Sequence, residues 1–392
     1  MSRKDPTRPG ATGQAVLLCM TRTSPTGQTS EVQITMASNE PIRITRDDLF
    51  SPQVEEQLAF QQALRRDLGE LEPQPWIVAV VYSSWFYLAL AGALGAVCAW
   101  MIMEPFFTDI PVAEGDDAAW IDILIFPTVA GFIGLFLGAA EGIMCRNFRR
   151  ALISGTVGLG VGFGGGLIAC FGAGIIFFVM TLLAVQFWEN PQPDQMPDGF
   201  ALLVFIMGRA AAWAVASIPA GLGQGIALRE KKVIVNGIIG AVLGGLLGGL
   251  LFDPIAMLFT TARGEAALSR AVGFSCIGLL VGLFVGLVET WTKTAWLLMR
   301  KGPLAGKQFI IYRDVTVLGS SPKAEIYLFK DEAIEPRHAV IRNRGGRYEI
   351  EDCNTADGTY VNGFPITRQF LQPGDQIVLG RTLLEFILRE AR

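Results

Sequence analysis

Six long apolar segments fill the middle of this chain and constrain its fold more than any other feature. They lie at about residues 84–104, 119–144, 151–187, 199–228, 233–260 and 268–297. A helix needs roughly 20 apolar residues to cross a bilayer core, and each segment is at least that long. Charged residues make up only 17% of the chain, against about 25% in ordinary soluble proteins. We therefore predict a polytopic α-helical membrane domain of about six transmembrane helices over residues 81–300.

Basic residues are unevenly distributed between the connecting loops. Loops 105–117 and 189–199 contain no Lys or Arg. The loops after the second, fourth and sixth segments are basic, with Arg146, Arg149, Arg150, Arg229, Lys231, Lys232, Lys293, Arg300 and Lys301. Because basic loops remain in the cytoplasm, we predict that both termini are cytoplasmic. The loop carrying Arg263 and Arg270 is an exception. The segment 151–187 is too long for one straight crossing, so we expect a kink near Gly165 or a division into two pieces.

Small residues recur at every fourth position along these segments. The pattern is clearest at Gly134, Gly138 and Gly142, at Ser217, Gly221 and Gly225, and at Gly278, Gly282 and Gly286. Such glycine-zipper stripes allow helix backbones to approach closely in lipid. We predict two tandem helical hairpins, 119–187 and 199–260, flanked by half-units. Glycine faces turned toward lipid would instead favour a homo-oligomer.

A few charged and polar residues interrupt the apolar segments. Glu141, Gln224 and Glu289 lie near cytoplasmic helix ends, where they can snorkel or pair with Arg146, Arg229 and Lys293. Arg209 lies twenty positions before Arg229, and Asp253 lies twenty-one positions after Lys232. These spacings place Arg209 and Asp253 at similar depth in antiparallel helices. Since an unpaired charge there is costly, we predict an intramembrane Arg209–Asp253 ion pair. A structural clamp is the favoured interpretation, and a transport site is the alternative.

The two ends of the chain differ in character from its middle. Residues 1–80 predict a cytoplasmic region that is partly disordered, with strand-like runs at 15–20 and 31–36 and a short helix over 53–68. No signal peptide is evident. Residues 305–392 alternate apolar and polar positions in short runs separated by Gly, Asn-Gly and Pro-Gly-Asp turns. This alternation predicts an all-β sandwich.

Four motifs in the C-terminal region are more specific than its periodicity. They read VLGSSPKAEIYL (317–328), EPRHAVI (335–341), YEIEDCNTADGTYVNG (348–363) and LQPGDQIVLG (371–380). In order and spacing they resemble the forkhead-associated (FHA) domain. The resemblance implies a twisted sandwich whose apical loops hold a peptide. In that family the peptide usually carries phosphothreonine, and bacterial members often act beside serine/threonine kinases.

The resemblance can be carried over residue by residue. It implies a structural role for His338, Asn362 and Gly363, and a peptide-binding role for Gly319, Ser320, Ser321, Lys323, Glu335, Arg337, Asp357 and Gly358. Ser320, Glu335 and Asp357 stand where the family has arginine, serine and asparagine. Carboxylates at two of these positions would repel a phosphate group, which prefers arginine and other donors. The resemblance therefore implies a retained scaffold that binds an unphosphorylated partner or makes an intramolecular contact.

Several classes of function are disfavoured by the composition. A net charge of −4 and the lack of a long basic run predict no nucleic-acid partner. The six cysteines have no metal-type spacing, so we expect no metal, cofactor or disulfide framework. No nucleophile–base set lies in the apolar segments, so we expect no enzyme. We predict a protein of the bacterial cytoplasmic membrane that presents an FHA-like domain to a cytoplasmic protein or peptide. The alternative is a small-solute channel or transporter regulated by that domain.

Overall fold

The computed structural model describes residues 33–35, 41–43, 59, 75–106, 119–188, 197–259 and 266–389. The chain divides into two compact units, Met1–Gln62 and Ala63–Arg392. In the first, β1 (Gln33–Thr35) pairs antiparallel with β2 (Pro41–Arg43), and β1 falls within the strand-like run 31–36. The strand predicted at 15–20 and nearly all of the helix predicted at 53–68 lie outside the described residues.

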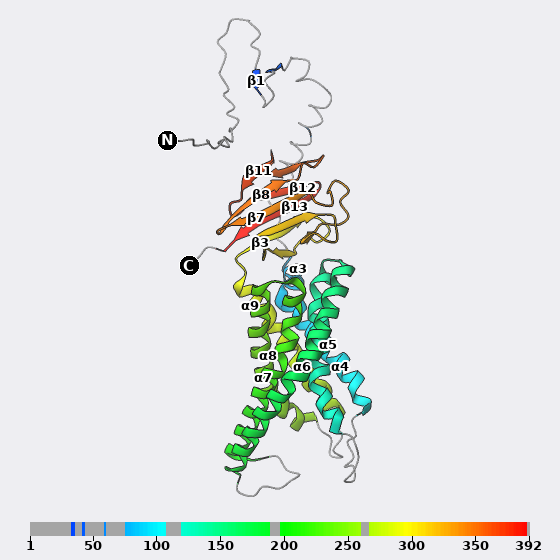
Figure 1. The fold of residues 1–392 in the computed structure, drawn as a ribbon, viewed down its shortest axis with the longest axis vertical. Coiled ribbons are helices and arrows are strands. Elements are labelled where there is room, and N and C mark those ends of the chain that lie inside the picture. Colours follow the sequence, from blue (N-terminus) through cyan, green and yellow to red (C-terminus); the bar gives the residue numbers. More distant parts are fainter. Residues whose placement is uncertain are drawn as a thin grey trace, which may run out of the picture. The chain divides into compact units, whose positions relative to one another are not determined.

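The described residues of the second unit contain seven α-helices followed by a β-sandwich (Figure 1). The helices are α3 (Trp76–Val81), α4 (Ser84–Met103), α5 (Ala119–Met144), α6 (Phe148–Val185), α7 (Gly199–Leu228), α8 (Lys231–Phe259) and α9 (Ala267–Thr292). Six of them, α4 to α9, are long and apolar enough to cross a membrane. The third long segment forms one unbroken helix, α6, of 38 residues. The predicted division of residues 151–187 is therefore wrong.

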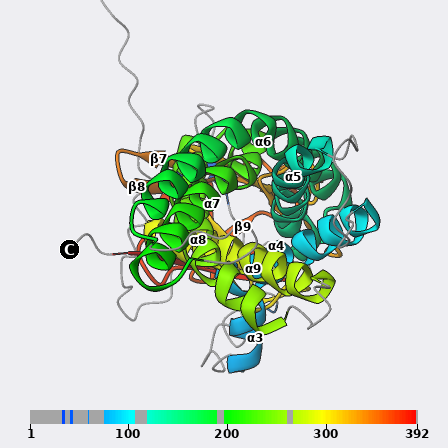
Figure 2. The ribbon, with the colours of Figure 1, turned by 90° about the horizontal axis from the view of Figure 1, so that it is seen from below.

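The six long helices pack as a ring (Figure 2). Each helix packs on the next along the chain, and α4 closes the ring by packing on α9 as well as on α5. The half-units expected at the two ends of the repeat thus meet as a third helix pair.

Glycines make these helix contacts possible at equivalent places in the three pairs. A Cβ atom on Gly134 would lie 2.5 Å from the carbonyl oxygen of Gly158, between α5 and α6. One on Gly221 would lie 2.2 Å from the Gly237 oxygen, between α7 and α8, and one on Gly92 would lie 2.1 Å from the Gly278 oxygen, between α4 and α9. Any side chain at these positions would push the backbones apart. These glycines therefore pack helices of one chain against each other.

The C-terminal strands form two facing sheets. The six-stranded sheet has the order β10-β9-β12-β13-β3-β4 and the five-stranded sheet has the order β11-β8-β7-β5-β6. The strands are β3 (Ala295–Lys301), β4 (Gln308–Ile310), β5 (Val315–Gly319), β6 (Ile326–Tyr327), β7 (Ala339–Arg344), β8 (Arg347–Asp352), β9 (Thr359–Val361), β10 (Phe364–Ile366), β11 (Arg368–Phe370), β12 (Gln376–Leu379) and β13 (Thr382–Leu388). Inward residues such as Leu297, Ile341, Ile350 and Phe386 are fully buried between the sheets.

Strand β3 corrects one predicted boundary. The sixth apolar segment was expected to run as a helix to residue 297, but α9 ends at Thr292 and Lys293 turns to an extended conformation. Residues 295–301 then pair with β13 and β4 inside the sandwich. A short apolar run following a helix cannot be told from helix by periodicity alone. The sandwich therefore starts at residue 295, ahead of the predicted boundary at 305.

Candidate peptide-binding site

Three loops of the sandwich meet and carry the residues predicted to bind a peptide. They are residues 320–325 after β5, residues 328–338 between β6 and β7, and residues 353–358 between β8 and β9. The amide of Ser320 donates to the carbonyl oxygen of Glu335 at 2.9 Å. The amide of Cys353 donates to the carbonyl oxygen of His338, also at 2.9 Å. Backbone hydrogen bonds thus hold the second loop to both of the others.

Gly319 is required by the close approach of the first two loops. A Cβ atom at this position would lie 2.3 Å from the carbonyl oxygen of Pro336 and 2.7 Å from its carbonyl carbon. Because these are backbone atoms, no rotamer change relieves the overlap. Gly319 therefore sets the spacing of the loops and leaves ligand contacts to its neighbours.

His338 is fully buried and ties two loops together with both ring nitrogens. Its Nδ1 accepts a hydrogen bond from the amide of Glu335 at 3.2 Å. The other nitrogen, Nε2, therefore carries the proton and donates to the carbonyl oxygen of Gly358 at 3.1 Å. With 0% of the residue exposed, the ring has no access to a ligand. The role of His338 is therefore structural, because its two hydrogen bonds hold the loops together.

The two carboxylates that replace family residues both lie at the surface. Glu335 and Asp357 are exposed, as is Arg337 in the second loop. The Oε1 atom of Glu335 accepts a hydrogen bond from the amide of Ala356 at 3.0 Å. An amide that could face an incoming anion is therefore already bound to a carboxylate. Asp357 precedes Gly358, which has a φ of +69° that suits glycine.

The remaining predicted binding residues differ in their surroundings. Ser320 and Ser321 are half-buried and Lys323 is exposed. The Ser321 hydroxyl accepts from the amide of Lys323 at 3.3 Å, which orders the loop locally. Within the described part of the chain, the side chains of Lys323 and Arg337 form no hydrogen bond or ion pair. Both cations are therefore available to a ligand.

Asp352 and Asn362 order the third loop and the turn after it. Burial alone would raise the pKa of Asp352, but hydrogen bonds from Thr359 and Thr355 outweigh burial and lower that pKa. Asn362 adopts a φ of +53° before Gly363 at +81°, as in a two-residue hairpin turn. Its Nδ2 donates to Asp375 at 2.9 Å, which fixes the turn between β9 and β10.

The first loop also contacts the helices, which the sequence did not reveal. Asn147, in the turn between α5 and α6, donates from Nδ2 to the carbonyl oxygen of Pro322 at 2.8 Å. Arg150 donates to the carbonyl oxygen of Glu325 at 3.0 Å. The adjacent Cys145 is 3% exposed and belongs to the apolar core of the sandwich. Burial raises the pKa of the Cys145 thiol to about 11.

Further contacts join helix ends to the sandwich. Arg313 pairs with Glu230 of the α7–α8 turn and with Glu325 of the first loop, both at 2.9 Å. The hydroxyl of Tyr312 donates to the carboxylate of Glu289 in α9. Burial and the charge of Glu289 raise the pKa of Tyr312 well above its usual value, so the phenol remains a donor.

The charged residues inside the helices find particular partners. The Nε of Arg209 lies 3.2 Å from Oδ1 of Asp253, which is 0% exposed. The Arg209 guanidinium also lies 5.0–5.6 Å from the ring centres of Phe177, Phe205 and Phe252. Other expected partners are wrong. Glu141 lies 3.6 Å from Arg150 in α6, four residues beyond the expected Arg146. Lys293, expected to pair with Glu289, donates instead to Gln308 at 2.6 Å.

Comparison with known proteins assigns the C-terminal region to a family. Residues 316–380 match the FHA domain. The oxoglutarate dehydrogenase inhibitor of Corynebacterium efficiens is 37% identical over 94 residues, which cover 24% of this chain and 66% of that protein. The glycogen accumulation regulator GarA of Mycolicibacterium smegmatis is 34% identical over 94 residues, covering 24% of this chain and 59% of that protein. The matched region therefore spans less than two thirds of the length of each of these relatives.

A solved structure described as an analysis of phosphothreonine-dependent FHA domain interactions is 25% identical. The match covers 25% of this chain and 100% of the chain in that structure, with a TM-score of 0.24. The family match over residues 316–380 identifies an FHA domain in the C-terminal region. The family consists of binding and regulatory modules, and the relatives are named as an inhibitor and a regulator. Within the described residues no group of three or more His, Cys, Asp or Glu side chains could hold a metal ion.

Proposed function

We propose that this protein is a membrane-anchored recognition protein of the bacterial cytoplasmic membrane. Its six long helices anchor the FHA domain at the cytoplasmic face, with both termini in the cytoplasm. There the domain recruits a protein partner in signalling linked to serine/threonine kinases. The loop carboxylates direct this recognition toward an unphosphorylated segment.

The membrane part of the proposal is supported by the outer surface of the helix ring. Large apolar side chains of α6 point away from the protein, including Ile168 (77% exposed), Phe171 (72%) and Phe178 (62%). Exposing so much contiguous apolar surface to water is unfavourable, whereas lipid accommodates it. The basic turn at Arg146 and the basic first residues of α8, Lys231 and Lys232, support a cytoplasmic sandwich.

One observation carries the recognition part of the proposal. Glu335, Arg337 and Asp357 are exposed on loops that the buried His338 holds in place. A rigid backbone with open polar side chains suits peptide binding, because few groups must be ordered on association. The Glu335 carboxylate already accepts the Ala356 amide, so a phosphate would meet a negative charge and one donor fewer. Arg337 favours an acidic residue in the bound segment.

The test uses the full chain in detergent against a peptide array with phosphothreonine and plain versions side by side. We expect wild type to bind acidic plain peptides without preference for phosphothreonine. The triple variant Ser320→Arg/Glu335→Ser/Asp357→Asn restores the family residues and should gain phosphothreonine preference. Preference for phosphothreonine in wild type would contradict the carboxylate argument. Failure to bind either version would contradict recognition itself.

A second candidate function, a small-solute channel or transporter, has one supporting observation. A cavity of about 370 Å³ lies among the helices, lined by Arg209 and aromatic side chains that include Phe177, Trp213 and Phe252. Solute flux through proteoliposomes that is lost in Arg209→Ala would favour transport. Flux equal to that of empty liposomes would leave Arg209 as a structural clamp.

A further inference from the structure

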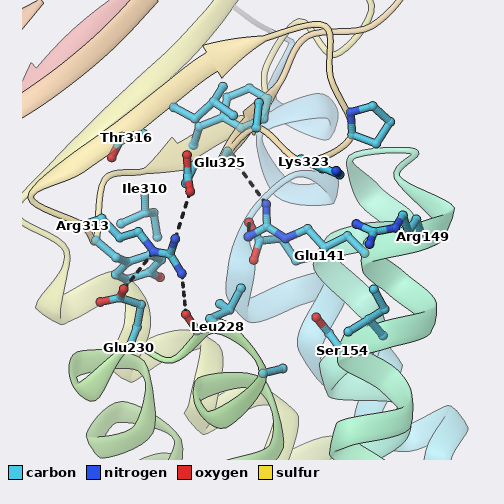
Figure 3. A pocket seen from close by; sticks show the side chains of 18 residues that line it. Glu141, Arg149, Ser154, Leu228, Glu230, Ile310, Arg313, Thr316, Lys323 and Glu325 are labelled. Carbon is cyan, nitrogen blue, oxygen red and sulfur yellow. Dashed lines mark hydrogen bonds and ion pairs between the residues drawn. The ribbon is translucent and has the colours of Figure 1, made fainter. Parts of the chain in front are cut away.

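A pocket of about 250 Å³ lies where the helices meet the sandwich (Figure 3). Its walls come from α5, from the first turns of α6, from the α7–α8 turn and from the strands and loops around β4 to β6. Charged and polar side chains line it together with the apolar Ile153 and Ile310. The pocket is therefore both polar and apolar, and it lies near the first turn of a long apolar helix.

The charges in the pocket do not cancel. Its three carboxylates are all paired: Glu141 lies 3.6 Å from Arg150, and Glu230 and Glu325 each lie 2.9 Å from Arg313. Two further cations line the pocket, Arg149 from α6 and Lys323 from the sandwich loop. Within the described residues, neither side chain has a hydrogen-bond or ion-pair partner. The pocket thus contains four cations and three carboxylates, a net charge of +1, and the two cations Arg149 and Lys323 lie on the same side of it in Figure 3.

A buried hydroxyl in the same pocket also lacks a partner. Thr316 is 3% exposed and lines the pocket, and its Oγ1 has no hydrogen-bond partner among the described residues. Leaving such a group unpaired is unfavourable, and a ligand oxygen in the pocket would satisfy it. Thr316 lies on the other side of the pocket from Arg149 and Lys323 (Figure 3), so it is these two cations that suit an anion with several oxygen atoms.

We propose that this pocket binds the phosphate-bearing headgroup of an anionic phospholipid. Arginine and lysine bind phosphate oxygens well, arginine through its two-pronged geometry. A lipid suits the pocket better than a free phosphate, because Arg149 is flanked by Phe148, which is 81% exposed, and Ile153, which is 46% exposed. Acyl chains can lie along this apolar surface while the headgroup enters the pocket. The inference rests on the membrane insertion proposed above.

The test is a titration of the full-length protein in neutral detergent, followed by native mass spectrometry. The probes are dioctanoyl phosphatidylglycerol, dioctanoyl phosphatidylcholine and inorganic phosphate. We expect saturable binding of phosphatidylglycerol and weaker binding of the other two. A basic residue near anionic lipid contributes about 1 kcal/mol, so Arg149→Gln/Lys323→Gln should weaken phosphatidylglycerol binding roughly 30-fold. The matched control Lys231→Gln/Lys232→Gln also removes two positive charges but should leave binding nearly unchanged, because neither lysine lines this pocket.

Four outcomes would overturn the lipid site. If both double variants weakened phosphatidylglycerol binding equally, only a general attraction between charges would be shown. If inorganic phosphate bound as tightly as the lipid, the site would be assigned to free phosphate. A phosphothreonine peptide whose binding depends on Arg149 and Lys323, while lipid binding does not, would assign these residues to the peptide site. Extraction of the protein from cell membranes by alkaline carbonate would instead contradict membrane insertion. Insertion without preference for phosphatidylglycerol would contradict the lipid site alone.

Discussion

The side-chain nitrogen of Asn147 lies 2.8 Å from the carbonyl oxygen of Pro322, which joins the α5–α6 turn to the first loop of the candidate site. The same side chain caps α6, because its Oδ1 accepts the amide of Arg150 at 3.0 Å. One residue thus begins a long helix and anchors a loop 175 positions away.

Substitution of Asn147 separates these two roles. Asn147→Ser keeps a helix cap but removes the donor to Pro322, so we expect the free energy of unfolding to fall by about 1 kcal/mol. Asn147→Ala removes both the cap and the donor and should lower the free energy of unfolding by about 2 kcal/mol. Thermal unfolding in detergent measures the difference. Hydrogen exchange in residues 320–326 should rise in both variants, and unchanged exchange would show that the contact does not hold the loop.

The Arg209–Asp253 pair can be tested by removing one partner or both. Arg209→Met leaves the fully buried Asp253 carboxylate uncompensated and should destabilise the helices by about 3–5 kcal/mol. Arg209→Met/Asp253→Leu removes both charges and should recover most of this loss. Thermal unfolding of the three proteins in one detergent checks the order. A double variant as unstable as the single one would contradict the clamp.

Two glycines in α6 form a matched pair. A Cβ atom on Gly158 would lie 2.1 Å from the carbonyl oxygen of Gly134, whereas one on Gly160 would meet nothing within 4 Å. We expect Gly158→Ala to lower the free energy of unfolding by about 1–3 kcal/mol, because the added methyl group displaces α5. Gly160→Ala should be neutral or stabilising by up to about 1 kcal/mol. Thermal unfolding measures both, and equal effects would argue against close packing at this seam.

The buried thiol of Cys145 predicts a dependence of stability on alkaline pH. Burial raises its pKa from 9.0 to about 11 in the folded state. Between these values the unfolded state loses the proton first, so stability falls as pH rises from about 9 to 11. The total loss is about 2–3 kcal/mol. Because other groups also titrate there, the measurement is the difference in unfolding free energy between wild type and Cys145→Ala at each pH. A difference that stays constant with pH would contradict the shift.

The sequence was sufficient wherever a local pattern carried the information. Segment length and composition located the six apolar helices, because a long apolar run has few alternatives to a helix. The motifs from residue 317 to residue 380 located the FHA domain, because its turns require Gly and Asn at fixed positions. The spacing of Arg209 and Asp253 from basic helix ends indicated equal depth, because the rise per residue of a helix is constant.

The sequence was insufficient where a choice depended on distant partners. Residues 295–301 became strand β3 because β13 and β4 offered hydrogen bonds, and Glu141 paired with Arg150 because the α5–α6 turn brings α6 alongside. Tyr312 and Glu289 met because the sandwich is seated on the helix ends. The sequence by itself therefore determined where the apolar helices and the FHA domain lie, and its motifs predict which loops bind a peptide. The tertiary structure decided how helices and sandwich contact each other, because those contacts arise from packing between residues far apart in the chain, which local propensity does not encode.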